Sequence, residues 1–223
     1  MENYGTFRKE NPDTPYYSFM VTIQNHGPYT FDKYGSSVNF NTSMDFHDEE
    51  TILLSNYFEG IMDCDRELKN LTDYLDGQQR PIVLVYFGDH MPLINNDFYN
   101  KVLPNDEDME SYVKRYTIPY IIWQNSEYKA LDDFAARENS RGREDGFSSF
   151  YLSAYLFDLL GFGGNNGYFR YVRAMMDEYP VILEYSHKDK TGEFKPNEGN
   201  SDIDELKKVE YFKLFDDTVS ERQ

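Results

Sequence analysis

The sequence predicts an α/β fold built around a layered sheet. The continuous apolar run Pro81–Phe87 has the composition of a strand that is covered on both faces. Strand candidates of this kind alternate along the chain with segments whose apolar residues recur every three or four positions, which is the period of a helix. This alternation is typical of a central, mostly parallel sheet with helices packed against it.

The amino-terminal third is expected to contain one strand. Residues 1–15 are polar and include two prolines, which indicates an irregular lead-in. Tyr17–Gln24 is rich in β-branched and aromatic residues and is predicted to be a strand. It ends in the turn-forming group Asn25–Pro28, and we expect residues 29–46 to form a long surface loop.

A long helix is predicted over residues 47–76, with Gly77 ending it. Acidic residues at positions 48–50 suit the positive end of the helix dipole. The apolar residues that share one face are Leu54, Tyr57, Ile61, Cys64, Leu68, Leu71 and Leu75. Cys64 is therefore expected to be a core residue, and as the single cysteine it cannot form an internal disulfide.

The remaining elements continue the alternation of strands and helices. We predict a strand at Ile118–Gln124, helices at Ser148–Leu160 and Gly167–Glu178, a short strand at Val181–Glu184, a turn-rich segment over 186–202 and a last helix at Asp204–Asp216.

The charge of the chain excludes one class of partner. It carries 22 basic and 40 acidic side chains, for a net charge of −18 over 223 residues. Because the basic residues are scattered and the chain repels a phosphate backbone, we expect no nucleic-acid binding. No apolar run is long enough to span a bilayer, and we expect the chain to be soluble.

The most informative motif is Gly88-Asp89-His90-Met91-Pro92, which follows the apolar strand directly. Functional groups gather at the carboxyl ends of strands in open α/β sheets. A carboxylate next to an imidazole is a natural pair of metal ligands, and the alternative is an Asp–His charge pair at the strand end.

His26 occupies a comparable place, after another predicted strand and before Gly27-Pro28. It could be a metal ligand, a hydrogen-bond donor to phosphate or a histidine that stabilises its own turn. His47 and His187 lie in polar surroundings, and we expect both at the surface. A P-loop, a GxGxxG fingerprint and a GxSxG nucleophile elbow are all missing from the sequence, and Cys64 does not lie in a C-x-P-x-R motif.

Several segments, in order, resemble one known family. They are YSFMVTIQNHGPY (17–29), IVLVYFGDHMP (82–92), YTIPYIIWQN (116–125), SSFYLSAYLFDLLG (148–161), YPVIL (179–183) and VEYFKLFD (209–216). The set is similar to the carboxyl-terminal half of the catalytic domain of lipoteichoic acid synthase-like enzymes, the phosphoglycerol transferases of the alkaline phosphatase/sulfatase superfamily. The resemblance implies that residues 1–223 form the carboxyl-terminal part of an alkaline phosphatase-like layered fold that is incomplete at its amino-terminal side.

This resemblance also implies a chemistry. Asp89 and His90 would be ligands of a divalent metal, with manganese expected and zinc or magnesium as alternatives, and His26 would contact the substrate phosphate. A threonine nucleophile, which we expect upstream of this chain, would transfer glycerol phosphate from a phosphatidylglycerol-type lipid to a cell-envelope acceptor. The parent protein would act at the extracytoplasmic face of the membrane. Without the amino-terminal half of the domain, this chain is expected to be inactive.

Three alternatives stay open. The substrate could instead be a sulfate ester or a phosphoethanolamine group within the same superfamily. The chain could be a non-catalytic binding module that keeps the crevice of the fold. In a third reading, His26, Asp89 and His90 would form a facial triad that binds iron.

Overall fold

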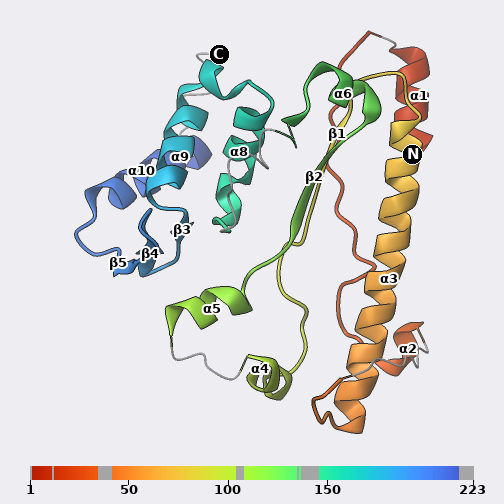
Figure 1. Ribbon diagram of the computed structural model, residues 1–223, viewed down its shortest axis with the longest axis vertical. Helices are drawn as coiled ribbons and strands as arrows, with labels where there is room; N and C mark the ends of the chain where they lie inside the picture. The colour runs from red at the N-terminus through yellow and green to blue at the C-terminus, as the bar shows by residue number, and fades with distance from the viewer. Residues whose placement is uncertain are drawn as a thin grey trace. The chain divides into compact units, whose positions relative to one another are not determined.

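The computed structural model describes residues 2–11, 13–34, 42–103, 108–134, 136 and 146–215. The chain forms two compact units, residues 1–133 and 134–223, which combine helices with small sheets (Figure 1). The predicted α/β class is confirmed. Among the described residues, no helix is long and apolar enough to cross a bilayer.

The first unit contains one long helix and several short elements. In chain order they are α1 (Glu2–Glu10), α2 (Phe31–Tyr34), α3 (Asp48–Asp76), β1 (Val83–Phe87), α4 (Asn96–Val102), α5 (Met109–Arg115), β2 (Tyr120–Gln124) and α6 (Ser126–Leu131). The predicted long helix and both apolar strands are confirmed. The prediction of an irregular lead-in is wrong over α1. Both prolines of residues 1–15 come after the end of that helix in the sequence, so they do not interrupt it. The loop predicted over 29–46 contains α2, and its residues 35–41 lie outside the described residues.

Strands β1 and β2 pair in antiparallel fashion, from Val83 opposite Gln124 to Phe87 opposite Tyr120. All the pairings found in the described residues are antiparallel, so the prediction of a mostly parallel sheet is wrong for them. A parallel pair needs a connection that crosses back along the sheet. Here the connection carries α4 and α5, which lie beyond one end of the two-stranded ribbon (Figure 1).

The segment Tyr17–Gln24 is not a strand, which corrects the prediction. No ladder in the described part of the chain includes it, and its apolar side chains are open to solvent, with Tyr17 86% and Ile23 78% exposed. The pattern favours a strand, but a strand forms only against a neighbour that offers free backbone groups. Strand β1 is also not covered on both faces, because Tyr86 and Phe87 stay exposed.

The core of the first unit is largely aromatic. Tyr29, Leu54, Ile94 and Tyr99 are buried together, and partly buried side chains pack around them. The cluster joins the segment after the Asn25–Pro28 turn, the helix α3 and the segment after β1. Burial of this apolar surface therefore draws the Asn25–Pro28 turn and the segment after β1 toward one end of α3.

The second unit combines helices with a small sheet. Its elements are η1 (Ser149–Tyr151), α8 (Leu152–Leu159), η2 (Gly163–Asn165), α9 (Gly167–Glu178), β3 (Val181–Ile182), β4 (Ser186–Lys188), β5 (Phe194–Pro196) and α10 (Ser201–Phe215). The predicted helices and the short strand are confirmed. The turn-rich segment 186–202 contains the hairpin β4–β5, which completes the antiparallel order β3-β4-β5.

Candidate functional site

The two candidate motifs of the first unit meet in space. Asp89 and His90 follow β1 after a single residue, Gly88. The Gly88 N–H donates to the Pro119 carbonyl over 3.2 Å and so continues the pairing of the two strands by one more residue. The rings of His26 and His90 stand edge to face, with centroids 6.2 Å apart and an angle of 87° between their planes. The structure thus brings together the three residues that the sequence singled out, although His26 lies 63 positions before Asp89 in the chain.

The hydrogen bonds of both rings identify the nitrogen that faces outward. His26 Nδ1 lies 2.8 Å from the Gly27 carbonyl oxygen, and His90 Nδ1 lies 2.7 Å from the Met91 carbonyl oxygen. A carbonyl oxygen only accepts, so each Nδ1 carries the hydrogen. In the neutral ring, Nε2 then holds a free lone pair, which is the arrangement that metal-binding histidines commonly use.

Asp89 places a carboxylate oxygen near His90 Nε2. One carboxylate oxygen accepts from the His90 backbone N–H over 2.9 Å, and the other lies 3.7 Å from His90 Nε2. That second distance is too long for a hydrogen bond between the two groups. Both side chains are largely exposed. The pair therefore presents one oxygen and one nitrogen that can share a cation.

This donor set fits part of a metal site. Carboxylate and imidazole together suit manganese or zinc better than magnesium, which prefers oxygen ligands. Within the described residues, however, no group of three or more His, Cys, Asp and Glu side chains is placed to hold a metal ion. The iron alternative needs three converged ligands and is not supported by this geometry. Asp89 and His90 remain predicted ligands in a set that other residues must complete.

A cavity of about 230 Å³ in the second unit is a further candidate. Its lining residues are Glu178, Tyr179, His187, Asp189, Lys190, Thr191, Lys195 and Asn200. His187 is only 3% exposed, so the prediction of a surface residue is wrong for it, whereas His47 is exposed as predicted. The polar segment around His187 folds into a hairpin against Tyr179. The rings of His187 and Tyr179 stand edge to face, with centroids 5.1 Å apart.

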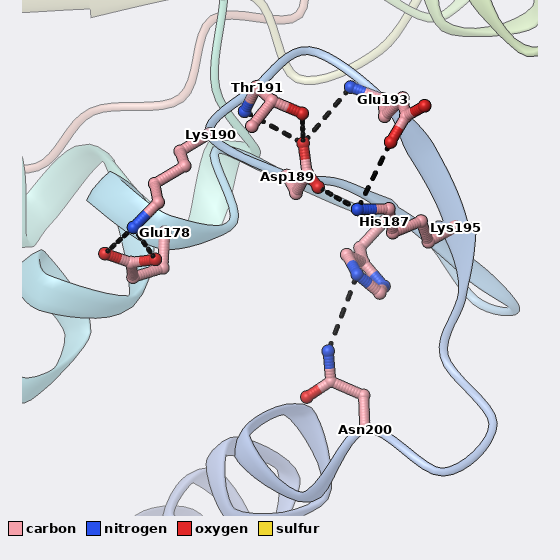
Figure 2. Close-up of polar contacts among 8 residues, drawn as sticks. All are labelled: Glu178, His187, Asp189, Lys190, Thr191, Glu193, Lys195 and Asn200. Carbon is pink, nitrogen blue, oxygen red and sulfur yellow. Dashed lines mark hydrogen bonds and ion pairs between the residues drawn. The ribbon is translucent and has the colours of Figure 1, made fainter.

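The polar side chains of this cavity form hydrogen bonds and ion pairs with their neighbours. His187 Nδ1 lies 2.9 Å from Asn197 Oδ1, and Asn200 Nδ2 faces His187 Nε2 at 3.5 Å. Lys190 pairs with Glu178 at 2.8 Å, and Lys195 pairs with Asp189 at 2.5 Å (Figure 2). Hydrogen bonds from Lys195 and Thr191 lower the pKa of the Asp189 carboxyl far below its usual range. We conclude that the cluster stabilises the hairpin.

One comparison with known proteins covers the first unit and part of the second. The family model described as "Sulfatase" matches residues 1–162. A protein of Rhizobium meliloti (strain 1021) called "Putative cyclic beta-1,2-glucan modification protein" is 27% identical over 119 residues, which cover 51% of this chain and 18% of that protein. An "Uncharacterized protein" of Haemophilus influenzae is 29% identical over 110 residues, which cover 49% of this chain and 19% of that protein.

The matched part of both relatives is small. The chain spans about a fifth of the length of each, at 18% and 19%. No solved structure matches the chain significantly.

Proposed function

Because this chain belongs to the sulfatase family, we propose that it supplies one part of a metal-dependent site that cleaves or transfers phosphate or sulfate esters. The observation that carries the proposal is the meeting of His26 and His90 beside the Asp89 carboxylate, with each ring held through Nδ1 by a backbone carbonyl. Members of this superfamily generally use divalent metals.

Each of the three side chains has a defined part in this proposal. Asp89 and His90 hold the cation through a carboxylate oxygen and Nε2. When bound, the cation stabilises negative charge on the ester oxygens and activates the nucleophile. His26 faces the anionic group itself: its Nδ1 stays on the Gly27 carbonyl, and its Nε2 is the ring atom left to contact an ester oxygen.

The finer proposal is phosphoglycerol transfer. A threonine oxygen from the amino-terminal half of the domain bonds to phosphorus while the bond from phosphorus to the diacylglycerol oxygen breaks, and the threonine proton passes to that oxygen. The acceptor hydroxyl then bonds to phosphorus, the bond to threonine breaks, and the acceptor proton restores the threonine hydroxyl. The name of the Rhizobium relative refers to a cyclic glucan, which supports a glycan of the cell envelope as the acceptor.

This proposal requires a partner segment for Tyr17–Gln24. Its exposed apolar side chains lie at odd and even positions, with Phe19 66%, Met20 69% and Val21 71% exposed. Apolar residues on both faces are typical of a central strand between two layers. We propose that strands from the amino-terminal half of the catalytic domain pair with it, in a parent protein at the extracytoplasmic face of the membrane.

Metal binding can be tested on this chain directly. With only four histidines, each imidazole gives a separate NMR signal, and bound manganese broadens the signals of nearby rings. We expect Mn²⁺ to broaden the signals of His26 and His90 at lower concentration than those of His47 and His187. Asp89→Asn should remove this selectivity, whereas Asp97→Asn, an exposed carboxylate in α4, should keep it. Equal broadening of all four rings contradicts the site.

The reaction can be tested in a protein that joins this chain to the amino-terminal half of the domain. We expect turnover of a phosphatidylglycerol analogue that depends on manganese and is lost in Asp89→Ala and His90→Ala, with His47→Ala as the control. Turnover of an aryl sulfate or of phosphatidylethanolamine instead would favour the sulfatase or phosphoethanolamine alternative. Full activity in either variant would contradict the assignment, and manganese binding without turnover of any ester would favour a binding module.

A further inference from the structure

The backbone around His26 shows a repeated arrangement of hydrogen bonds. Four successive carbonyls each accept from a side chain. The Gln24 carbonyl accepts from the Tyr34 hydroxyl over 2.8 Å, and the Asn25 carbonyl accepts from the Tyr29 hydroxyl over 2.8 Å. The His26 carbonyl accepts from Lys33 Nζ, and the Gly27 carbonyl accepts from His26 Nδ1.

Three of these donors come from one short segment, residues 29–34, so the loop is held from a single side. Tyr29 is only 3% exposed and belongs to the core cluster, which anchors the segment. The Lys33 ammonium lies 5.2 Å from the centre of the Tyr29 ring and 5.5 Å from that of Tyr34, and cation–π attraction holds it there. All three side chains thus support one another as well as the backbone.

Such a set of bonds fixes the orientation of three peptide planes and, with them, the direction in which the His26 side chain leaves the backbone. The Nδ1–H bond to Gly27 then fixes the ring itself. Burial raises the pKa of Tyr29 to about 12, and the pKa of Tyr34 is also raised, so both hydroxyls remain donors at physiological pH.

We propose that Tyr29, Lys33 and Tyr34 are positioning residues that hold His26 against His90. The hydrogen bonds from these three side chains all lie within residues 24–34. This clamp of Tyr29, Lys33 and Tyr34 acts on the backbone of His26 and not on the ester. The importance of the clamp for catalysis rests on the proposed function, whereas the position of the His26 ring does not.

The position of the ring can be measured without substrate or metal. In the unaltered chain we expect a nuclear Overhauser effect between the rings of His26 and His90, and a long-range ¹H–¹⁵N pattern that identifies both as Nδ1–H tautomers. Lys33→Met should abolish the ring-to-ring effect and shift the His26 signals, while those of His187 stay in place. Lys33→Arg keeps a cationic donor and should restore the effect.

Two further variants keep the test independent of folding. Tyr34→Phe removes one hydroxyl and leaves the ring under Lys33, so a weakened effect with an unchanged circular dichroism spectrum identifies the hydrogen bond as the cause. Tyr112→Phe, an exposed tyrosine in α5, is the matched control. Unchanged His26–His90 contacts in both Lys33→Met and Tyr34→Phe would overturn the proposal.

The clamp and the proposed function fail in different ways. If manganese broadens no ring selectively but Lys33→Met still releases His26, the clamp stands and the metal site is wrong. If manganese selects His26 and His90 in the unaltered chain and Lys33→Met changes neither ring, the metal site stands and the clamp is wrong.

Discussion

Gly60 of α3 and Asn25 of the candidate site are in direct contact. A Cβ atom at position 60 would overlap Asn25 Oδ1 and lie 3.1 Å from Asn25 Cγ and 3.3 Å from the Tyr34 hydroxyl. Asn25 Oδ1 is buried there, and none of the described residues donates a hydrogen bond to it. The missing side chain of Gly60 is therefore the reason that the loop carrying His26 can lie against the helix.

Gly60→Ala is expected to displace this loop. Alanine favours a helix by about 1 kcal/mol over glycine, but overlap with a packed side chain costs about 1–3 kcal/mol. We predict a lower midpoint in thermal unfolding and loss of the contact between the His26 and His90 rings in NMR spectra. Gly77→Ala is the control, since a Cβ there would lie at an ordinary 3.6 Å from the Tyr74 carbonyl oxygen. An equal or higher midpoint with the ring contact intact would contradict the prediction.

Asn125 joins the segment between α3 and β1 to the start of α6, and its loss should destabilise the first unit. The side chain is fully buried; its Nδ2 donates to the Arg80 carbonyl over 2.8 Å, and its Oδ1 accepts from the N–H groups of Ile82 and Tyr128. We predict that Asn125→Ala lowers the free energy of unfolding by about 1–3 kcal/mol for the buried groups left unpaired, plus about 1 kcal/mol for the lost cap of α6.

Urea unfolding followed by circular dichroism measures that change. Asn95→Ala removes the cap of α4 at an exposed position and should cost only about 1 kcal/mol. Equal losses in both variants would mean that the buried contacts of Asn125 add nothing.

The Glu50–Lys101 pair should make the chain sensitive to acid. Lys101 Nζ lies 2.6 Å from a carboxylate oxygen of Glu50, which is only 3% exposed, and this bond lowers the pKa of Glu50 below the ordinary value of 4.5. A lowered pKa in the folded state contributes stability that is fully present above pH 4.5 and is lost as the pH falls through the folded-state value.

Lys101→Met should reverse the direction in which folding stability changes with pH. It leaves a buried carboxylate without its cation, so the variant is destabilised at neutral pH and regains part of the loss as Glu50 is protonated on acidification. Unfolding midpoints measured across that pH range test this. Lys69→Met, which breaks the exposed pair with Asp73, is the control and should follow the unaltered chain.

His187 should matter for the second unit and not for metal binding. His187→Ala removes the His187 partner of the buried Asn197 Oδ1, and we predict a cost of about 1–3 kcal/mol in the unfolding of that unit. Selective broadening of the His26 and His90 signals by manganese should remain. His47→Ala, at an exposed position, should change neither quantity. Loss of the selective broadening in His187→Ala would place this residue at the metal.

How much of the molecule could be predicted depends on the range of the interactions involved. The helix over 48–76 follows from apolar residues spaced along a single segment, and the structure places it within one residue of the prediction. The motif of Asp89 and His90 was found because two unusual residues directly follow an apolar strand. The clamp around His26 has no such signal, because tyrosine and lysine in a predicted loop are common.

Local pattern therefore determined the α/β class, the long helix, the two apolar strands and the candidate residues His26, Asp89 and His90. Tertiary structure decided the rest. It set the antiparallel pairing of β1 with β2, placed no strand of the described part of the chain beside Tyr17–Gln24, buried His187 and brought His26 to His90. The physical reason is that side-chain spacing reports which face of a segment is apolar, whereas pairing and burial depend on which distant segments share a core.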